Sequence, residues 1–392
     1  MSTIVRPSRV PSRLRASQRP GSERPRLTLV ESDAAPVSAE SDRVVVRWLV
    51  GCAIAVALAV AIGGITRLTE SGLSITQWKP VSGVIPPLTA DAWADAYQRY
   101  LAIPEAQTVH RGITMAEFRS LFWWEWAHRV LARVVGLVLA VPFFVLLVRR
   151  RIRPGMRLRL MNLPLLAALQ GAMGWYMVQS GLSGRTSVSP YRLVAHLAVA
   201  LVIFGIAVWT AAELSVSSAD RERVRMPRSP RWAAAVSLSF VALAFLTMLS
   251  GGFVAGLDAG KVFNTFPLME GKVIPVGYDA LGGWRNAFEN PIAAQLHHRL
   301  LAIGTAVLIW GAWLVAMLRS WPWHVRRGLA VASAVTALQV TLGIGTLLLS
   351  VPVLIAVLHQ LTGLALFAVL LMLSQRLREA PPSKASLVGA GR

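Results

Sequence analysis

The chain has 392 residues, of which 55% are hydrophobic and only 15% charged, and its formal net charge is +21. A typical soluble domain is about 25% charged, so this composition argues against a soluble globular protein. The positive charge alone would suggest a nucleic-acid partner, but its placement excludes one. Of the 40 Lys and Arg, 27 fall in the terminal tails and in alternate loops between apolar stretches, a distribution that reports membrane topology.

Eight apolar stretches are long enough to cross a bilayer, which takes roughly 20 residues of helix. In chain order they are predicted at 44–65, 120–148, 158–180, 191–213, 232–254, 292–318, 326–350 and 353–377. Because basic loops stay on the cytoplasmic side, both termini are expected there. The sequence therefore predicts an all-α integral membrane protein with eight transmembrane helices.

The first 43 residues are rich in Arg, Ser and Pro and lack apolar periodicity, so they are predicted to form a disordered cytoplasmic tail. A mitochondrial presequence is the alternative, because such segments are also rich in Arg and Ser but poor in acids. The five acids of this tail are Glu23, Glu31, Asp33, Glu40 and Asp42. They favour a bacterial inner membrane protein over a mitochondrial one.

The chain repeats itself, which indicates two similar halves. The N-terminal four-helix half is predicted at 44–213, the basic cytoplasmic linker at 214–231, the C-terminal half at 232–377 and the cytoplasmic tail at 378–392. Landmarks recur in the same order: Gly63-Gly64 with Gly251-Gly252, Glu70 with Asp258, His128-Arg129 with His298-Arg299, Gln170 and Gly174 with Gln339 and Gly343, and His196 with His359. Since four spans restore the starting side, the halves should be related by a pseudo-two-fold axis along the membrane normal.

Two outer loops are long, at about 66–119 and 255–291. The first carries several aromatic residues that suit a cap lying on the membrane interface. They are Trp78, Trp93, Tyr97 and Tyr100.

Four histidines lie within roughly two turns of the outer ends of even-numbered spans: His128, His196, His298 and His359. Two helices of one bundle can present an imidazole each to opposite faces of a flat cofactor, and neutral imidazole is a common axial ligand of heme iron. A histidine hydrogen-bonded inside the bundle is the alternative, which four matched positions disfavour. Isolated metal ions are also disfavoured, because no cluster of carboxylates or thiolates completes a coordination shell.

The other three histidines are not predicted to be ligands. His297 adjoins His298 but projects about 100° away around the helix, so alignment with His128 selects His298. His110 in the outer loop and His324 in an inner loop are predicted to be solvated surface residues.

The two halves differ beside their first histidines. Glu125 stands three residues before His128 on the same helical face, whereas the matched position holds Gln295, which cannot ionise. One interpretation is an ion pair between Glu125 and Arg129. The favoured one is an acid that handles protons or orients substrate, present only where chemistry occurs. The first half would then be reactive, and the second would hold a permanent electron-transfer heme.

Three arginines lie within predicted spans, and intramembrane cations need partners. Heme propionates suit guanidinium groups, because the two form paired hydrogen bonds. The candidate propionate contacts are Arg129, Arg299 and, in the outer loop, Arg67. Arg129 and Arg299 could instead snorkel to the outer surface. For the deeper Arg133, either an ion pair or a propionate contact is expected.

At these positions the sequence resembles the heme A synthase family, membrane enzymes that convert heme O to heme A for cytochrome oxidases. The resemblance covers about residues 45–375. Its motifs are GGITRLTESGLS (63–74), Trp78-Lys79-Pro80, Pro86-Pro87, Glu125-Trp126-Ala127-His128-Arg129, Asn264-Thr265-Phe266-Pro267-Leu268-Met269, His298-Arg299 and His359-Gln360. The cysteine pair that some bacterial members carry in the first outer loop is absent from residues 66–119, so the chain looks like the proteobacterial and mitochondrial branch.

The resemblance implies heme b as cofactor, held by His298 and His359. It implies a substrate site for heme O at His128 and His196, with Glu125 as the essential acid. The implied reaction oxidises one ring methyl through an alcohol to a formyl group, by two hydroxylations and loss of water. Heme O synthase and cytochrome oxidase assembly factors are implied partners within the lipid bilayer, and a homo-oligomer is allowed.

Two other functions compete with this one. A di-heme b-type membrane cytochrome that transfers electrons from quinol would share the four histidines, but it would not need Glu125. A transporter is suggested by the repeat. It would be expected to have broken, Gly/Pro-interrupted helices at matched midplane positions, and the spans show no such pair.

Overall fold

The computed structural model describes residues 39–182, 187–215 and 231–378. Within these ranges the chain is helical, and its one β-type pairing is an isolated bridge between Met269 and Lys272. Most of the predicted N-terminal tail, the linker at 214–231 and the tail at 378–392 lie outside the described residues.

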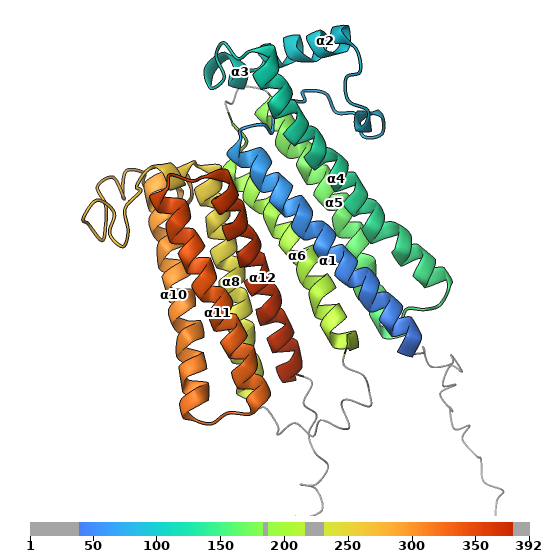
Figure 1. Cartoon of the computed structure of the whole chain (residues 1–392), viewed down its shortest axis with the longest axis vertical. Coiled ribbons are helices and arrows are strands. Elements are labelled where there is room, and N and C mark those ends of the chain that lie inside the picture. The colour runs from blue at the N-terminus through green and yellow to red at the C-terminus, as the bar shows by residue number, and fades with distance from the viewer. Residues whose placement is uncertain (1–38, 183–186, 216–230, 379–392) are drawn as a thin grey trace, which may run out of the picture. The chain divides into compact units, whose positions relative to one another are not determined.

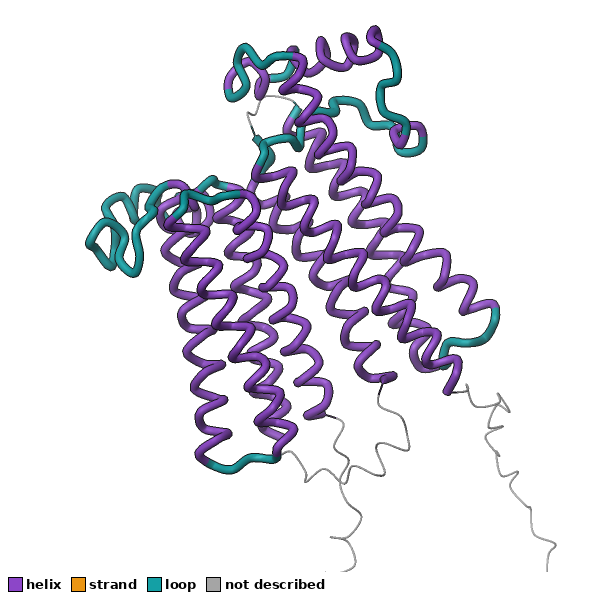
Figure 2. Tube along the Cα trace, viewed as in Figure 1, coloured by secondary structure: helices purple, strands orange, loops and turns teal. Residues whose placement is uncertain are grey.

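Eight long helices make up most of the described chain (Figures 1 and 2). They are α1 (Ala39–Leu68), α4 (Met115–Val148), α5 (Arg157–Gly181), α6 (Pro190–Ser215), α8 (Arg231–Gly256), α10 (Pro291–Leu318), α11 (Trp323–Leu348) and α12 (Val353–Arg378). Short elements lie between them: η1 (Ser82–Val84), α2 (Ala90–Leu101), α3 (Pro104–Thr108), η2 (Pro154–Met156), η3 (Ala259–Lys261) and α9 (Trp284–Glu289).

The helix starts differ most from expectation at α1, which begins at Ala39 rather than at 44, and at α4, which begins at Met115 rather than at 120. The prediction of a disordered tail is therefore wrong for residues 39–43. Acidic side chains at Glu40 and Asp42 lie in the first turn, where they favour helix because the amino end of a helix carries partial positive charge. Nε of Arg153 also donates to Asp42 (3.0 Å).

Seven of the eight long helices are long and apolar enough to span a membrane, so the chain is a multi-pass membrane protein. The exception is α5, which has 25 residues and hence a length of about 37 Å at 1.5 Å per residue. Its polar side chains, among them Arg157, Arg159 and Gln170, lower its hydropathy. A count of eight spans thus stays a prediction.

The long helices pack as two groups of four (Figure 1). In the first, α1 packs against α4 and α6, and α5 packs against the same two helices. In the second, α8 packs against α10 and α12, and α11 packs against the same two. Contacts of α6 with α8 and α12, and of α1 with α12, join the groups.

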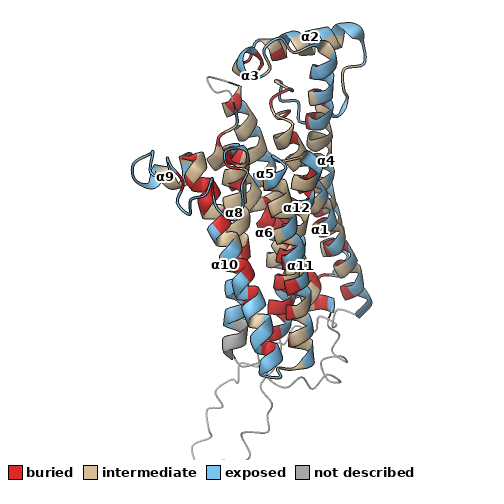
Figure 3. Ribbon diagram, turned by 60° about the vertical axis from the view of Figure 1, so that its left-hand side comes forward, coloured by how far each residue is buried: buried red, intermediate tan, exposed pale blue. Residues whose placement is uncertain are grey.

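A continuous apolar core runs through both groups towards their inner ends. Phe367 of α12 joins them, since its ring lies 6.4 Å from that of Phe204 on α6 and 6.2 Å from that of Phe245 on α8. Exposed residues line the outward faces of the helices (Figure 3), and many of them are large and apolar, such as Leu137 of α4 and Val307 of α10. An apolar outer face is what a helix in contact with lipid requires.

The first outer loop folds back over α4 as a cap. Trp93, Tyr97 and Tyr100 pack on Phe118 and Phe122. The predicted cap is thus present and packs on the outward extension of α4, and its place at the membrane interface stays a prediction. Trp78 is 43% exposed, as an interfacial residue would be.

Helix caps fix where the histidine-bearing helices begin. Thr114 forms a capping box with Glu117 at the start of α4, which satisfies the free amide groups of the first turn. Asn290 caps α10, and Pro291 occupies its first turn, a position where the missing N–H of proline costs nothing. These caps set the depth of the ligand residues that follow.

The groups of helices also meet through a polar contact. Nε2 of Gln360 on α12 donates to the carbonyl oxygen of Val60 on α1 (3.1 Å). A Cβ added to Gly64 would lie only 2.1 Å from Oε1 of Gln360, so only glycine admits this amide. At the matched junction, Gly252 of α8 faces Leu197 of α6. Gln360 and Leu197 each follow a predicted histidine ligand, and each packs on a glycine in the other group of helices.

Gly64→Ala is therefore expected to destabilise the protein by about 1–3 kcal/mol, as overpacking does. The matched control is Gly51→Ala in the same helix, where a Cβ would meet nothing within 4 Å. It should be neutral or stabilising by up to about 1 kcal/mol. Denaturant unfolding in detergent measures both, and equal stabilities for the two variants would contradict the contact.

Candidate functional site

All four predicted histidine ligands lie against glycines. The first of each pair, His128 and His298, has its ring edge against a helix of the same group: a Cβ on Gly63 would lie 2.9 Å from Cε1 of His128, and one on Gly251 would lie 3.1 Å from Cε1 of His298. The second histidines repeat the arrangement. The distances are 3.3 Å from Gly174 to His196 and 2.8 Å from Gly343 to His359.

The members of each predicted pair lie in the same group of helices. His196 is near enough to His128 for their charges to interact, and the same holds for His298 and His359. Each pair joins two helices of one group, α4 with α6 and α10 with α12. The neighbouring His297 points elsewhere, since its Nε2 lies 3.1 Å from Oη of Tyr278 in the outer loop.

The C-terminal pair is held in one tautomer by the chain. Nδ1 of His298 lies 2.8 Å from Oγ of Ser250, which donates its own proton to the carbonyl of Thr247, so Nδ1 must be the donor. Nδ1 of His359 lies 3.1 Å from the carbonyl oxygen of Gln339, which can only accept. Both rings therefore carry the proton on Nδ1 and leave Nε2 unprotonated, as a metal ligand must be.

The N-terminal pair has no such support. Nδ1 of His128 and Nδ1 of His196 are buried and have no hydrogen-bond partner among the described residues. The position matched to Ser250 is Ile62, which has no hydroxyl group. The rings of this pair are thus less firmly oriented than those of the other.

These donors suit a heme better than a bare ion. The described residues contain no group of three or more His, Cys, Asp or Glu side chains placed to hold a metal ion. A heme iron needs only two axial ligands, because its other four come from the porphyrin. Paired imidazoles backed by glycines, two of them with an unprotonated Nε2, match that requirement.

Glu125 is buried beside His128, with 2% of its surface exposed. Its Oε2 accepts from Oγ of Ser74 (2.7 Å) and from the amide of Ile75 (2.6 Å). Its Oε1 accepts from Nε and Nη2 of Arg129 (3.0 and 2.6 Å). The ion pair considered from the sequence is therefore present, and the start of the outer loop adds two further donors.

The same place in the other half holds an amide in place of the acid. Nε2 of Gln295 donates to the carbonyl of Phe263 (3.0 Å). Arg299 donates to the carbonyls of Phe263 and Thr265, just as Arg129 donates to those of Ile75 and Gln77. The two arginines thus make matched contacts to the two outer loops, and only the N-terminal half places a carboxylate there.

The two arginines not yet placed also have partners within the chain. Arg133 donates to the carbonyls of Pro80, Lys79 and Arg129 (2.6–2.8 Å), and it forms no ion pair with any described residue. Arg67 pairs with Asp258 of the other outer loop (2.5 Å). Loop carbonyls, which the sequence does not reveal as partners, stabilise Arg133 inside the apolar region.

Comparison with known proteins shows the family of this chain. A family model described as "Cytochrome oxidase assembly protein" matches residues 46–371. The chain belongs to this family. Heme A synthases of Parvibaculum lavamentivorans and Rhizobium meliloti are 40% and 44% identical to it, over 88% and 80% of this chain and 96% and 84% of their own. That of Mesorhizobium japonicum is 43% identical over 85% of this chain and 92% of its own.

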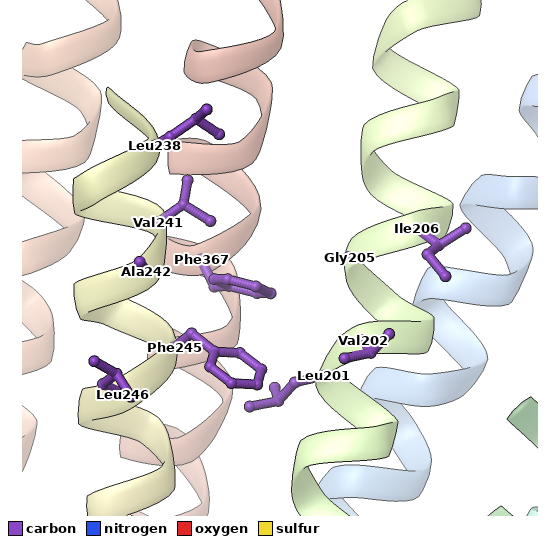
Figure 4. A pocket seen from close by; sticks show the side chains of 10 residues that line it. All are labelled: Leu201, Val202, Gly205, Ile206, Leu238, Val241, Ala242, Phe245, Leu246 and Phe367. Carbon is purple, nitrogen blue, oxygen red and sulfur yellow. The ribbon is translucent and has the colours of Figure 1, made fainter. Parts of the chain in front are cut away.

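An apolar groove between α6 and α8 lies outside the candidate site. Its lining comes from these two helices and from Phe367 of α12 (Figure 4). Leu201, Phe245 and Leu246 are typical of the lining, which contains no titratable side chain. The groove therefore offers no group for heme ligation or proton transfer.

A buried polar cluster in the cap was missed from the sequence. Oη of Tyr100 lies 2.5 Å from Nδ1 of His110 and donates to Oε1 of Glu105 (3.3 Å). Nε2 of His110 lies 3.6 Å from Glu70. The prediction that His110 is solvated is wrong, since only 18% of its side chain is exposed. An acid such as Glu105, in a loop of mixed composition, gives no sequence signal of burial.

Burial raises the pKa of Glu105 to about 8, and the negative charges of Glu125 and Glu70 add to this effect. The Tyr100 hydrogen bond and the positive charge of Arg67 oppose it. The folded protein thus keeps a proton on Glu105 that the unfolded chain releases near pH 4.5. Its contribution to stability is present below that pH and is lost as the pH rises to about 8.

Glu105→Gln is expected to flatten this part of the pH dependence, because an amide cannot lose the proton. Melting temperatures of the two proteins in detergent, measured from pH 5 to 8, should diverge as the pH rises, with the wild type falling further. Parallel curves would contradict the raised pKa of Glu105.

Proposed function

We propose that this protein is a heme A synthase, an oxidoreductase that oxidises a ring methyl of heme O to a formyl group. In this proposal heme b is the resident cofactor at His298 and His359, and heme O binds as substrate at His128 and His196. The halves at 44–213 and 232–377 then have different roles. Family membership and relatives at 40–44% identity over most of the chain support the reaction.

The different support of the two histidine pairs carries the assignment of the halves. Ser250 and the Gln339 carbonyl fix the rings of the C-terminal pair, and such partners orient a ligand and raise its affinity for metal. A permanent cofactor benefits from that arrangement. A substrate that must leave after each turnover suits the N-terminal pair, whose Nδ1 atoms are unsupported.

Glu125 is the proposed acid of the reactive half. Four donor contacts hold its carboxylate beside His128, so its orientation is set before substrate binds. A preoriented group loses little freedom during reaction, which lowers the barrier. Ser74 and Arg129 are positioning residues for Glu125. Gln295 cannot take the same role, because an amide does not act as a general acid or base.

The cofactor would supply one-electron redox chemistry. The chain supplies the geometry around it. Nε2 of His298 and of His359 would hold the cofactor in this proposal, and the amide of Gln339, 3.5 Å from Nε2 of His359, would have to move aside.

The remaining assignments follow from the reaction and the charge pattern. We place the protein in the bacterial inner membrane with both termini in the cytoplasm, because basic residues concentrate in the inner loops and tails. Heme O synthase is the expected source of substrate, and cytochrome oxidase assembly factors are expected to receive the product.

Glu125→Gln is expected to retain heme b while heme A formation falls by at least about 100-fold, the low end for losing a general acid or base. Pigment extraction and chromatography after co-expression with a source of heme O measure the product, and the absorption spectrum measures bound heme. The matched control is Gln295→Glu, which should leave heme A formation far less affected. Full activity of Glu125→Gln would favour a di-heme cytochrome with no chemistry on heme.

His298→Ala and His359→Ala are each expected to abolish the low-spin spectrum of heme b in purified protein, because one imidazole alone leaves an axial position open. His297→Ala is the control, since this neighbouring ring faces Tyr278, and it should keep the spectrum. Unchanged spectra of the first two variants would show that the cofactor is assigned to the wrong half.

A further inference from the structure

Arg192 lies at the outer end of α6, one turn before His196 on the same face of the helix. Its guanidinium carbon lies 4.2 Å from the ring centre of Tyr176 on α5, and its Nη2 donates to Oη of that residue (3.1 Å). Its Nη1 is buried and has no hydrogen-bond partner among the described residues. A buried donor on a charged group is costly to leave unpaired, so a missing acceptor is indicated.

The other half replaces this polar pair with an apolar one. By alignment of His196 with His359 and of Gly174 with Gly343, Arg192 matches Ile355 and Tyr176 matches Gly345. The matched residues also lie together, because a Cβ on Gly345 would be 3.9 Å from Ile355. The two matched positions thus lie against each other in both halves, but only in the N-terminal half, which contains Glu125, is one of them a cation.

The arginines first considered for carboxylate binding are already engaged. Arg129 and Arg299 donate to loop carbonyls, and Arg67 pairs with Asp258. Arg192 differs from Arg129 and Arg67 in keeping a buried terminal nitrogen without an acceptor. Arg299 also has an unpaired atom, but this is Nε, and both of its terminal nitrogens are occupied.

The chemistry of the proposed substrate supplies a suitable acceptor. Heme carries two carboxylates on one edge, and charged groups in a bilayer are least costly where they face the aqueous side. A heme bound to His196 near the outer end of α6 would therefore direct that edge outward, towards Arg192. A guanidinium group binds a carboxylate through short, charge-assisted hydrogen bonds.

We propose that Arg192, held by Tyr176, binds a carboxylate of the substrate heme and so distinguishes the substrate site from the cofactor site. This inference rests on the proposed function, because it takes His196 as a ligand of the substrate. An anionic lipid headgroup offers similar chemistry at this depth, and the experiment below separates the two.

The test uses the full-length protein, purified with its resident heme, in discs of phosphatidylcholine. Ferric protoheme and its dimethyl ester, which lacks both charges, are the probes, and the change in absorbance on binding a second heme gives each affinity. The wild type is expected to bind protoheme roughly 10- to 100-fold more tightly than the ester, the range for a hydrogen bond to a charged group. Arg192→Met should lose this preference by weakening only protoheme, and Arg192→Lys should keep part of it.

Arg119→Met is the matched control, since Arg119 also stacks on an aromatic ring, that of Trp93 (4.9 Å), but in the cap. It should leave the preference for protoheme unchanged. The spectrum of the resident heme checks that each variant is folded.

The possible outcomes distinguish failure of the proposed role of Arg192 from failure of the proposed substrate site. Equal binding of protoheme and ester by the wild type, or the same preference in Arg192→Met, overturns the role of Arg192 and leaves the heme sites standing. An effect of Arg192→Met that appears only in discs containing phosphatidylglycerol assigns the residue to lipid and overturns it too. Failure of the wild type to bind any second heme contradicts the substrate site itself.

Discussion

The arrangement of the four histidines depends on one contact, that of an imidazole edge with the backbone of a neighbouring helix at a glycine. Each of the four histidines makes it, at Cβ-equivalent distances of 2.8–3.3 Å. A side chain larger than hydrogen there would push the ring away, and two rings on separate helices could no longer face one flat cofactor. Close helix packing in the membrane relies on small residues for the same reason. The glycines thus let each predicted ligand lie close against a neighbouring helix.

The halves share this contact and differ in the polar groups around it. Near the C-terminal pair, hydrogen bonds settle the tautomer, and the amide of Gln295 replaces the acid. Near the N-terminal pair the chain leaves Nδ1 atoms unsupported but fixes a buried carboxylate and places a cation one turn outward. A resident cofactor needs firm ligands, whereas a substrate must be held, altered and released. One helical plan can therefore serve both roles.

Periodicity and repetition predicted the long helices, the matched histidine positions and Glu125 beside His128, because residue types and their spacing can be read directly from the sequence. What could not be predicted depends on distant contacts. Arg133 finds loop carbonyls rather than an acid, since backbone acceptors carry no residue signature. Glu105 and His110 are buried because the cap folds over α4, and that fold follows from packing between segments far apart. The support of His359 likewise comes from a carbonyl group.

The most direct test of the central claim is the electron paramagnetic resonance spectrum of the wild-type protein after expression with ample heme, together with its heme content. The account predicts up to two hemes per chain, and for the resident one the low-spin ferric signal of an iron held by two imidazoles. A colourless protein, or a high-spin signal from the resident heme, would contradict the proposal that facing imidazoles bind it.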